Sequence, residues 1–149
     1  MNEEVQNLLH REGMTLASIA KRSVAFFIDE LLLSFLLILS LGDAFFEAET
    51  TEEMIILTNK FILEYIAMKI FYQAFFTMQY GASLGKLAMK IRVIDINTLS
   101  NVNVLVSLNR AVVRVVSEMF FYLGFLWGMM DKSSQAWHDK TAKTLVINV

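Results

Sequence analysis

The stretch Ser23–Leu41, SVAFFIDELLLSFLLILSL, decides the fold. As a helix, its 19 residues would extend about 28 Å, close to the roughly 30 Å thickness of the hydrocarbon core of a bilayer. Its apolar residues surround the helix instead of forming one stripe, and Asp29 and Glu30 are its only charges. This pattern predicts a first transmembrane helix over residues 23–41.

A second apolar segment, residues 54–78, is also long enough to cross a bilayer, but it carries Lys60, Glu64 and Lys69. An ionised side chain at the bilayer centre costs roughly 2.5–3.5 kcal/mol. We therefore expect a second transmembrane helix whose charges face protein or water.

The distribution of basic residues predicts the orientation of this pair of helices. The linker 42–53 holds five acidic residues and no lysine or arginine, whereas Lys21 and Arg22 precede the first helix. Four basic residues follow the second helix, in residues 79–110. Because short cytosolic loops are enriched in lysine and arginine, we expect a helical hairpin with its linker outside and the N-terminus in the cytosol.

The third apolar segment, residues 104–130, leaves two alternatives open. Its uncharged part, residues 119–130, is too short to span a bilayer, and Gly124 and Gly128 offer places to turn back. The tail, residues 131–149, contains Lys132, Lys140 and Lys143, which favour the cytosol. We expect an interfacial helix followed by a re-entrant segment, and the alternative is a third crossing with an external tail.

Two short segments rich in β-branched residues, 90–96 and 144–149, are typical of strands. An unpaired strand is marginal, so we expect the two to pair on the cytosolic side. For residues 1–22 we expect a cytosolic tail or interfacial helix, with a disordered tail as the alternative. The predicted fold class is an all-α membrane protein: a transmembrane hairpin, a third membrane-associated segment and a small cytosolic β element.

Composition agrees with a membrane protein and excludes several kinds of site. Hydrophobic residues make up 56% of the 149 residues, the mean hydropathy is +0.50, and the net charge is −2. The chain has no cysteine and two distant histidines, so we expect no metal site, no cofactor and no nucleic-acid partner. The sequence GASLGKL at residues 81–87 is one residue short of a phosphate-binding loop, so we expect a tight turn there and no nucleotide.

The charges inside the two predicted transmembrane helices form the candidate site. Counting residues from the cytosolic ends of an antiparallel hairpin places Lys69 within about one helical turn of Asp29 and Glu30. Together with Glu64, these residues suggest a polar pathway or a proton-linked site. The alternative is a set of structural ion pairs that fix how the helices pack.

A set of short motifs in a fixed order resembles the RDD family of membrane proteins. These motifs are Arg22, Asp29, Gly81-x-Ser83-x-Gly85-Lys86, Arg92-Val-Ile-Asp95, Arg110 with Arg114, and His138-Asp139-Lys140-x-Ala142-x-Thr144-x-Val146. The resemblance covers about residues 15–149. It implies that the arginine and two aspartates for which the family is named are Arg22, Asp29 and Asp139, and it implies a bacterial inner membrane and a transport-like role.

Two functions of different classes remain open at this point. The first is an ion-coupled transporter or transporter component, which needs an oligomer because so short a chain can hardly enclose a pathway. The second is a non-catalytic adaptor or scaffold that docks a membrane partner through its cytosolic segments. No nucleophile or cofactor motif indicates an enzyme. The residues expected to matter are Arg22, Asp29, Glu30, Glu64, Lys69, Arg110, Arg114 and Asp139.

Overall fold

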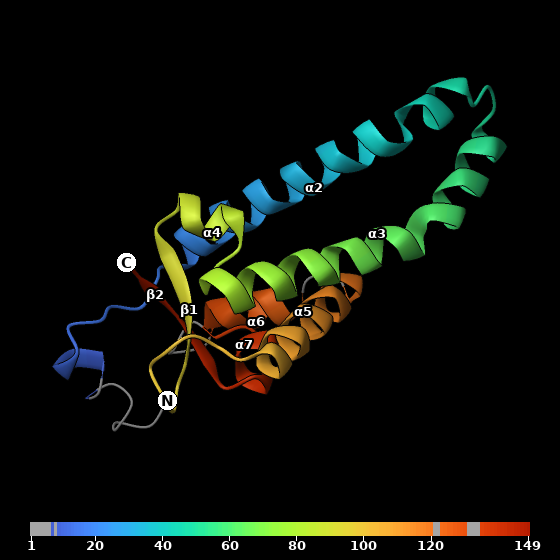
Figure 1. Ribbon diagram of the computed structural model, residues 1–149. Helices are drawn as coiled ribbons and strands as arrows, with labels where there is room; N and C mark the ends of the chain where they lie inside the picture. Colours follow the sequence, from blue (N-terminus) through green and yellow to red (C-terminus); the bar gives the residue numbers. More distant parts are fainter. Residues whose placement is uncertain (1–6, 8, 121–122, 131–134) are drawn as a thin grey trace.

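A long antiparallel pair of helices dominates the computed structural model, which describes residues 7, 9–120, 123–130 and 135–149 (Figure 1). Helix α2 spans Ile19–Glu47 and α3 spans Thr51–Tyr80, so both extend beyond the predicted ranges. The side chains of Thr50 and Glu53 form a capping box that starts α3 sharply. The connection between the helices is therefore short, as expected of a hairpin.

The remaining elements gather at the open end of this hairpin, away from its tip (Figure 1). They are α4 (Leu84–Ala88), β1 (Ile91–Asp95), α5 (Val104–Met119), α6 (Leu123–Met130), α7 (Trp137–Thr141) and β2 (Thr144–Asn148). Helix α5 packs along the C-terminal half of α3 and against α7. Helix α4 packs against the start of α2.

Strands β1 and β2 pair antiparallel, with Val93 opposite Val146. The stretch before α2 continues this sheet, because the Ala17 N–H donates to the Val146 carbonyl at 2.9 Å and Leu16 bridges Ile147. For this stretch, the expectation of a free or surface-lying tail is wrong: its backbone completes the free edge of β2.

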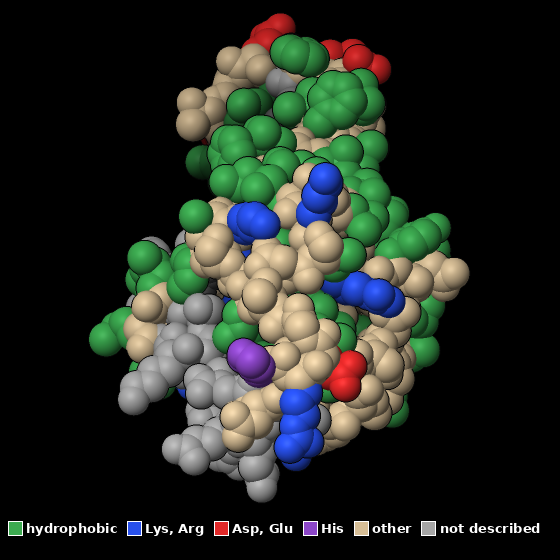
Figure 2. Space-filling model, turned by 90° about the vertical axis from the view of Figure 1, so that its left-hand side faces the viewer, with side chains coloured by type: hydrophobic (Ala, Val, Ile, Leu, Met, Phe, Trp, Pro, Cys, Tyr) green, Lys and Arg blue, Asp and Glu red, His purple; other side chains and the backbone are tan. Residues whose placement is uncertain are grey.

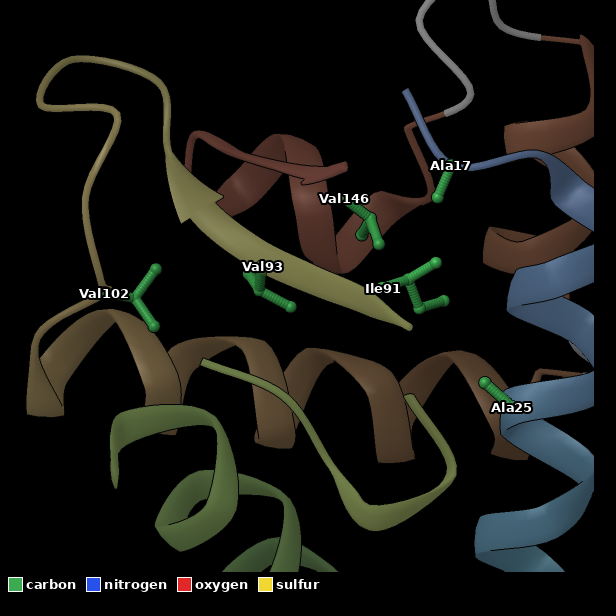
Figure 3. Close-up of a cluster of buried hydrophobic side chains, with 6 residues drawn as sticks. All are labelled: Ala17, Ala25, Ile91, Val93, Val102 and Val146. Atoms are coloured by element: carbon green, nitrogen blue, oxygen red, sulfur yellow. The ribbon is translucent and has the colours of Figure 1, made fainter. Parts of the chain in front are cut away.

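A small apolar core joins the sheet to the helices (Figure 3). Its buried side chains come from the stretch before α2, from α2, from both strands and from the loop before α5: Ala17, Ala25, Ile91, Val93, Val102 and Val146. This cluster fixes the start of α2 relative to the sheet, and so it positions the charged residues of α2.

The third apolar segment is divided in two. Helix α5 is capped at Phe120 and α6 has 8 residues, which is about 12 Å of helix. Gly124 and Gly128 lie inside α6, so the prediction that the chain turns at these glycines is wrong. Residues 121–122 between the helices, and Lys132 in the tail, lie outside the described residues.

Helix α5 is amphipathic, but it buries its polar side and exposes much of its apolar side, the opposite of a surface helix in a soluble protein. Its polar residues Ser107, Arg110 and Arg114 are buried, whereas Leu105 and Leu108 are exposed. In water, apolar residues of such a helix face the core. The inverted arrangement suits a helix with protein on its polar side and an apolar medium on the other.

Within the described residues, one helix is both long enough and apolar enough to cross a membrane, and it lies in α2 at Ile19–Ala44. Most of this stretch is exposed, with Phe27, Phe35 and Leu39 all more than half accessible. A buried core helix of a soluble protein would hide such residues.

Candidate functional site

Asp29 is completely buried, at 0% exposure, and accepts four hydrogen bonds. Its Oδ1 accepts hydrogen bonds from the Tyr72 hydroxyl at 2.7 Å and from the Gly85 N–H at 2.8 Å. Its Oδ2 accepts from the Ser83 hydroxyl at 2.6 Å and from Gln73 Nε2 at 3.3 Å. Four donors around one carboxylate stabilise its ionised form and tie α2 to α3 and α4.

The turn between α3 and α4 delivers two of these donors. Gly81 ends α3 in the left-handed region, at φ +70°, which a residue with a side chain rarely adopts. Gly85 lies so close to α2 that an added Cβ would overlap the Ala25 carbonyl oxygen. The glycines expected to make a tight turn therefore also permit the contact with Asp29.

Asp139 forms a second buried centre, between two arginines. It pairs with Arg22 of α2 and, at 2.6 Å, with Arg110 of α5, and it also accepts from the Ala136 N–H at 3.1 Å. Burial alone would raise the pKa of Asp139, but the adjacent guanidinium groups of Arg22 and Arg110 outweigh it and hold that pKa well below its usual range. The pair Arg22–Asp139 thus connects the start of α2 to α7.

His138 and Thr144 complete this centre. Arg110 also donates to the Thr144 hydroxyl, and His138 Nε2 lies 3.5 Å from Asp139. Burial, outweighing the attraction of Asp139, lowers the pKa of His138 well below its usual value, so the imidazole is neutral at pH 7. This agrees with a structural role for the adjacent residues His138 and Asp139.

A third centre surrounds Lys69. Its ammonium lies 3.0 Å from Glu30 and 2.5 Å from Glu118, and Arg114 lies 3.2 Å from Glu118 and 3.8 Å from Glu30. These side chains are less sealed than Asp29, since Glu30 is 21% and Glu118 10% exposed. We call Glu30, Lys69, Arg114 and Glu118 the ionic quartet, two acids and two bases that balance in charge.

The depth count from the sequence places Lys69 correctly beside Glu30. Its partner is not Asp29, which instead has Arg114 Nη1 at 3.8 Å. The expectation that Glu64 joins the site is wrong, because Glu64 lies on an exposed side of α3. The other seven expected residues lie in two sets of buried ion pairs: Arg22 and Arg110 with Asp139, and Lys69 and Arg114 with Asp29 and Glu30.

Sequence reasoning missed several residues of this site. They are Tyr72, Gln73, Glu118 as a partner of Lys69, His138 and Thr144 as parts of the Asp139 centre, and the buried Lys86. The spacing of Arg114 and Glu118 at i and i+4 already indicated that pair. Lys86, His138 and Thr144 stand in the motifs of the family resemblance, but nothing local assigned them these contacts, and Tyr72 and Gln73 carry no local signal at all.

Across the part of the chain that the structure describes, no group of three or more His, Cys, Asp or Glu side chains is placed to hold a metal ion. What the geometry offers is carboxylates paired with basic groups, of which Asp29 and Asp139 are completely buried and those of the ionic quartet are partly exposed.

Comparison with known families gives one match. A model of the RDD family matches residues 16–143, which is most of the chain. No curated protein and no solved structure matches significantly.

Proposed function

The chain belongs to the RDD family of membrane proteins, and on that premise we propose that it exchanges protons or monovalent cations across the membrane at the ionic quartet. The exchanging groups in this proposal are the carboxylates of Glu30 and Glu118. The protein acts as an oligomer in the inner membrane, because one hairpin cannot enclose a pathway.

The proposal includes a topology. Helices α2 and α3 cross the bilayer, the acidic tip near Glu49 faces outward, and the sheet and both termini lie in the cytosol. Figure 2 supports this arrangement: on the face shown, acidic side chains gather at the tip, an apolar band follows, and basic side chains lie beyond the band. Exposed apolar residues along α3, such as Ile62, Leu63 and Phe71, suit contact with lipid.

The observation that carries the proposal is the position of Lys69 between two acids. A single ammonium satisfies Glu30 and Glu118 at once, at 3.0 Å and 2.5 Å. If the lysine side chain swings aside, Glu30 and Glu118 keep only Arg114 as a basic partner, and the one uncompensated negative charge favours uptake of a proton or of one small cation. Ionisable groups at membrane depth are rare because they are costly, and they commonly mark ion pathways.

Asp29 and Asp139 have a different role in this proposal. Both are completely buried and bonded to several donors, so their protons and charges are not available for exchange. They fix the start of α2 against α4, α5 and α7, and so hold Glu30 in position beside Lys69.

Reconstitution into proteoliposomes with an internal pH-sensitive dye tests the proposal. Addition of Na⁺, K⁺ or Li⁺ in turn should produce a cation-dependent pH change, and Glu30→Gln should abolish it. Glu64→Gln is the matched control, because it makes the same change at an exposed acid. If wild-type vesicles show no pH change with any cation, the exchange proposal fails. Clean capture of a membrane partner by the same preparation would then favour the adaptor.

A further inference from the structure

A small cavity lies between α3, α4, α5 and α7, behind the ionic quartet. It is lined by Gln73, Thr77, Lys86, Ser107, Arg110, Ala111, Arg114 and His138. The space open in it to the centre of a water-sized particle is about 10 Å³, enough for one water or one ion of similar size. Among these described lining residues none is acidic, whereas three are basic. Such a lining attracts an anion and repels a cation.

Lys86 differs from the two arginines beside it. Arg110 pairs with Asp139, and Arg114 pairs with Glu118. Lys86 makes no hydrogen bond and no ion pair with any residue that the structure describes, although its side chain is buried. Burial first, and then repulsion by Arg110 and Arg114, lowers the pKa of Lys86 well below its usual value. An anion in the cavity would reverse this effect.

Ser107 supplies a second unsatisfied group at the same cavity. Its side chain is 1% exposed, and its hydroxyl has no hydrogen-bond partner among the residues that the structure describes. A buried hydroxyl without a partner costs roughly 1–3 kcal/mol, so native proteins usually fill such positions with a water or an ion. The Ser107 hydroxyl and the Lys86 ammonium are both donors, so one acceptor between them satisfies both.

The charge balance of the surrounding ion pairs points the same way. Among the described residues, these ion pairs join four acids and four bases in two sets: Asp139 with Arg22 and Arg110, and Asp29, Glu30 and Glu118 with Lys69 and Arg114. Together the two sets are neutral when all their members are ionised. Lys86 forms no ion pair with either set, so in its protonated form it adds one positive charge to this balance, with no described acid at ion-pair distance.

We propose that this cavity binds one small monovalent inorganic anion, of halide size, between Lys86 and Ser107, with Arg110 and Arg114 completing the positive lining. The small volume suits a single halide, whereas sulfate and phosphate are larger. The site shares Arg114 with the ionic quartet, but its own ligands, Lys86 and Ser107, are not part of the quartet, and the proposal does not depend on the proposed transport.

Equilibrium dialysis of the purified full-length protein in detergent against radioactive chloride tests this directly. Gluconate, too large for the cavity, replaces chloride at constant ionic strength. We expect one saturable chloride per chain, displaced by bromide and not by sulfate. Absence of saturable binding to the wild-type protein means that the cavity holds water only, and it overturns the proposal whatever the variants do.

Variants locate the site. Lys86→Met should weaken chloride binding by at least about tenfold, and Ser107→Ala by roughly two- to tenfold, as expected for a charged and a neutral hydrogen bond. Lys90→Met makes the same change at an exposed lysine and should leave the affinity unchanged. Equal affinity in wild type, Lys86→Met and Ser107→Ala would place the anion elsewhere and overturn the assignment. Should Lys86→Met fail to fold, Ser107→Ala carries the test alone.

Discussion

Replacing Asp29 by asparagine separates a structural acid from an exchanging one. The two side chains have the same shape, but asparagine presents one oxygen and one NH₂ group. With the NH₂ at the position of Oδ1, it would meet the Gly85 N–H, a fixed backbone donor now 2.8 Å away. With the NH₂ at the position of Oδ2, the Ser83 hydroxyl can rotate and accept a hydrogen bond from it. The Gln73 side chain can likewise turn its amide over and present its oxygen as an acceptor. We therefore expect Asp29→Asn to adopt the second orientation and to fold.

The cost follows from the hydrogen bonds. A bond to a charged group contributes about 1.5–3 kcal/mol, against about 0.5–1.5 kcal/mol for a neutral one. In the variant, the four hydrogen bonds that Asp29 accepts are replaced by bonds to a neutral side chain, which are weaker. In return, the cost of burying a charged carboxylate away from water disappears. Asp29→Asn should then lower the free energy of unfolding by about 2–4 kcal/mol. Asp29→Ala should cost more, because the Gly85 N–H and the Tyr72 hydroxyl both lose their acceptor.

Equilibrium unfolding in mixed detergent, followed by circular dichroism, measures these differences. Asp43→Asn is the matched control at an exposed position near the tip, and it should change stability by less than about 0.5 kcal/mol. The folded Asp29→Asn protein should retain cation-dependent exchange. A variant as stable as wild type, or one that folds normally yet has lost exchange, refutes the structural role of Asp29.

Three further predictions test other parts of the structure. Gly85→Ala should destabilise the protein more than Asp29→Asn, because its Cβ would overlap the Ala25 carbonyl; equal melting temperatures of wild type and variant would mean that α4 packs differently. In gluconate, Lys86→Met should be more stable than wild type at neutral pH. This difference in stability should vanish as the pH rises toward about 10.4, the pKa of an unfolded lysine. Below that pH the unfolded wild type binds a proton at Lys86 that the folded protein does not bind, and this favours unfolding. Thermal melts that show no such pH dependence contradict the lowered pKa of Lys86. Cysteines introduced at Ala48 and Thr141 should react differently with an impermeant reagent on spheroplasts, only the first being labelled; labelling of both places the tail outside.

The hairpin could be predicted from the sequence because hydropathy and charge act locally. A largely apolar stretch such as residues 23–41 indicates a long helix by itself, and the flanking Lys21, Arg22 and acidic linker favour one orientation for it. The same length arithmetic places Lys69 beside Glu30, since two antiparallel helices share one depth scale.

The contacts of Asp29 could not be predicted in this way. They depend on a turn whose two glycines bring the backbone of α4 against α2, and only the packed structure specifies that approach. The docking of residues 15–17 on β2 was missed for a related reason. Those residues are too few to show a strand pattern, and their partner lies at the other end of the chain.

The pairing of Arg22 with Asp139 illustrates the value of the family resemblance. Nothing in the spacing of two residues separated by most of the chain links them, but the resemblance names both as family residues. The structure then gives that pair a physical reason: Asp139 connects Arg22 of α2 with Arg110 of α5.

Sodium isotope exchange tests the central claim, that Glu30 and Glu118 exchange ions around Lys69, most directly. Sealed proteoliposomes loaded with unlabelled sodium would be diluted into trace radioactive sodium, and uptake of the isotope would be followed over time. The account predicts rapid, saturable uptake by wild type and by Glu64→Gln, and uptake at the level of empty vesicles for Glu118→Gln. Sodium uptake by folded Glu118→Gln as fast as that of wild type would contradict the account. It would also be contradicted if wild type took up sodium, and every other monovalent cation tried, no faster than empty vesicles do.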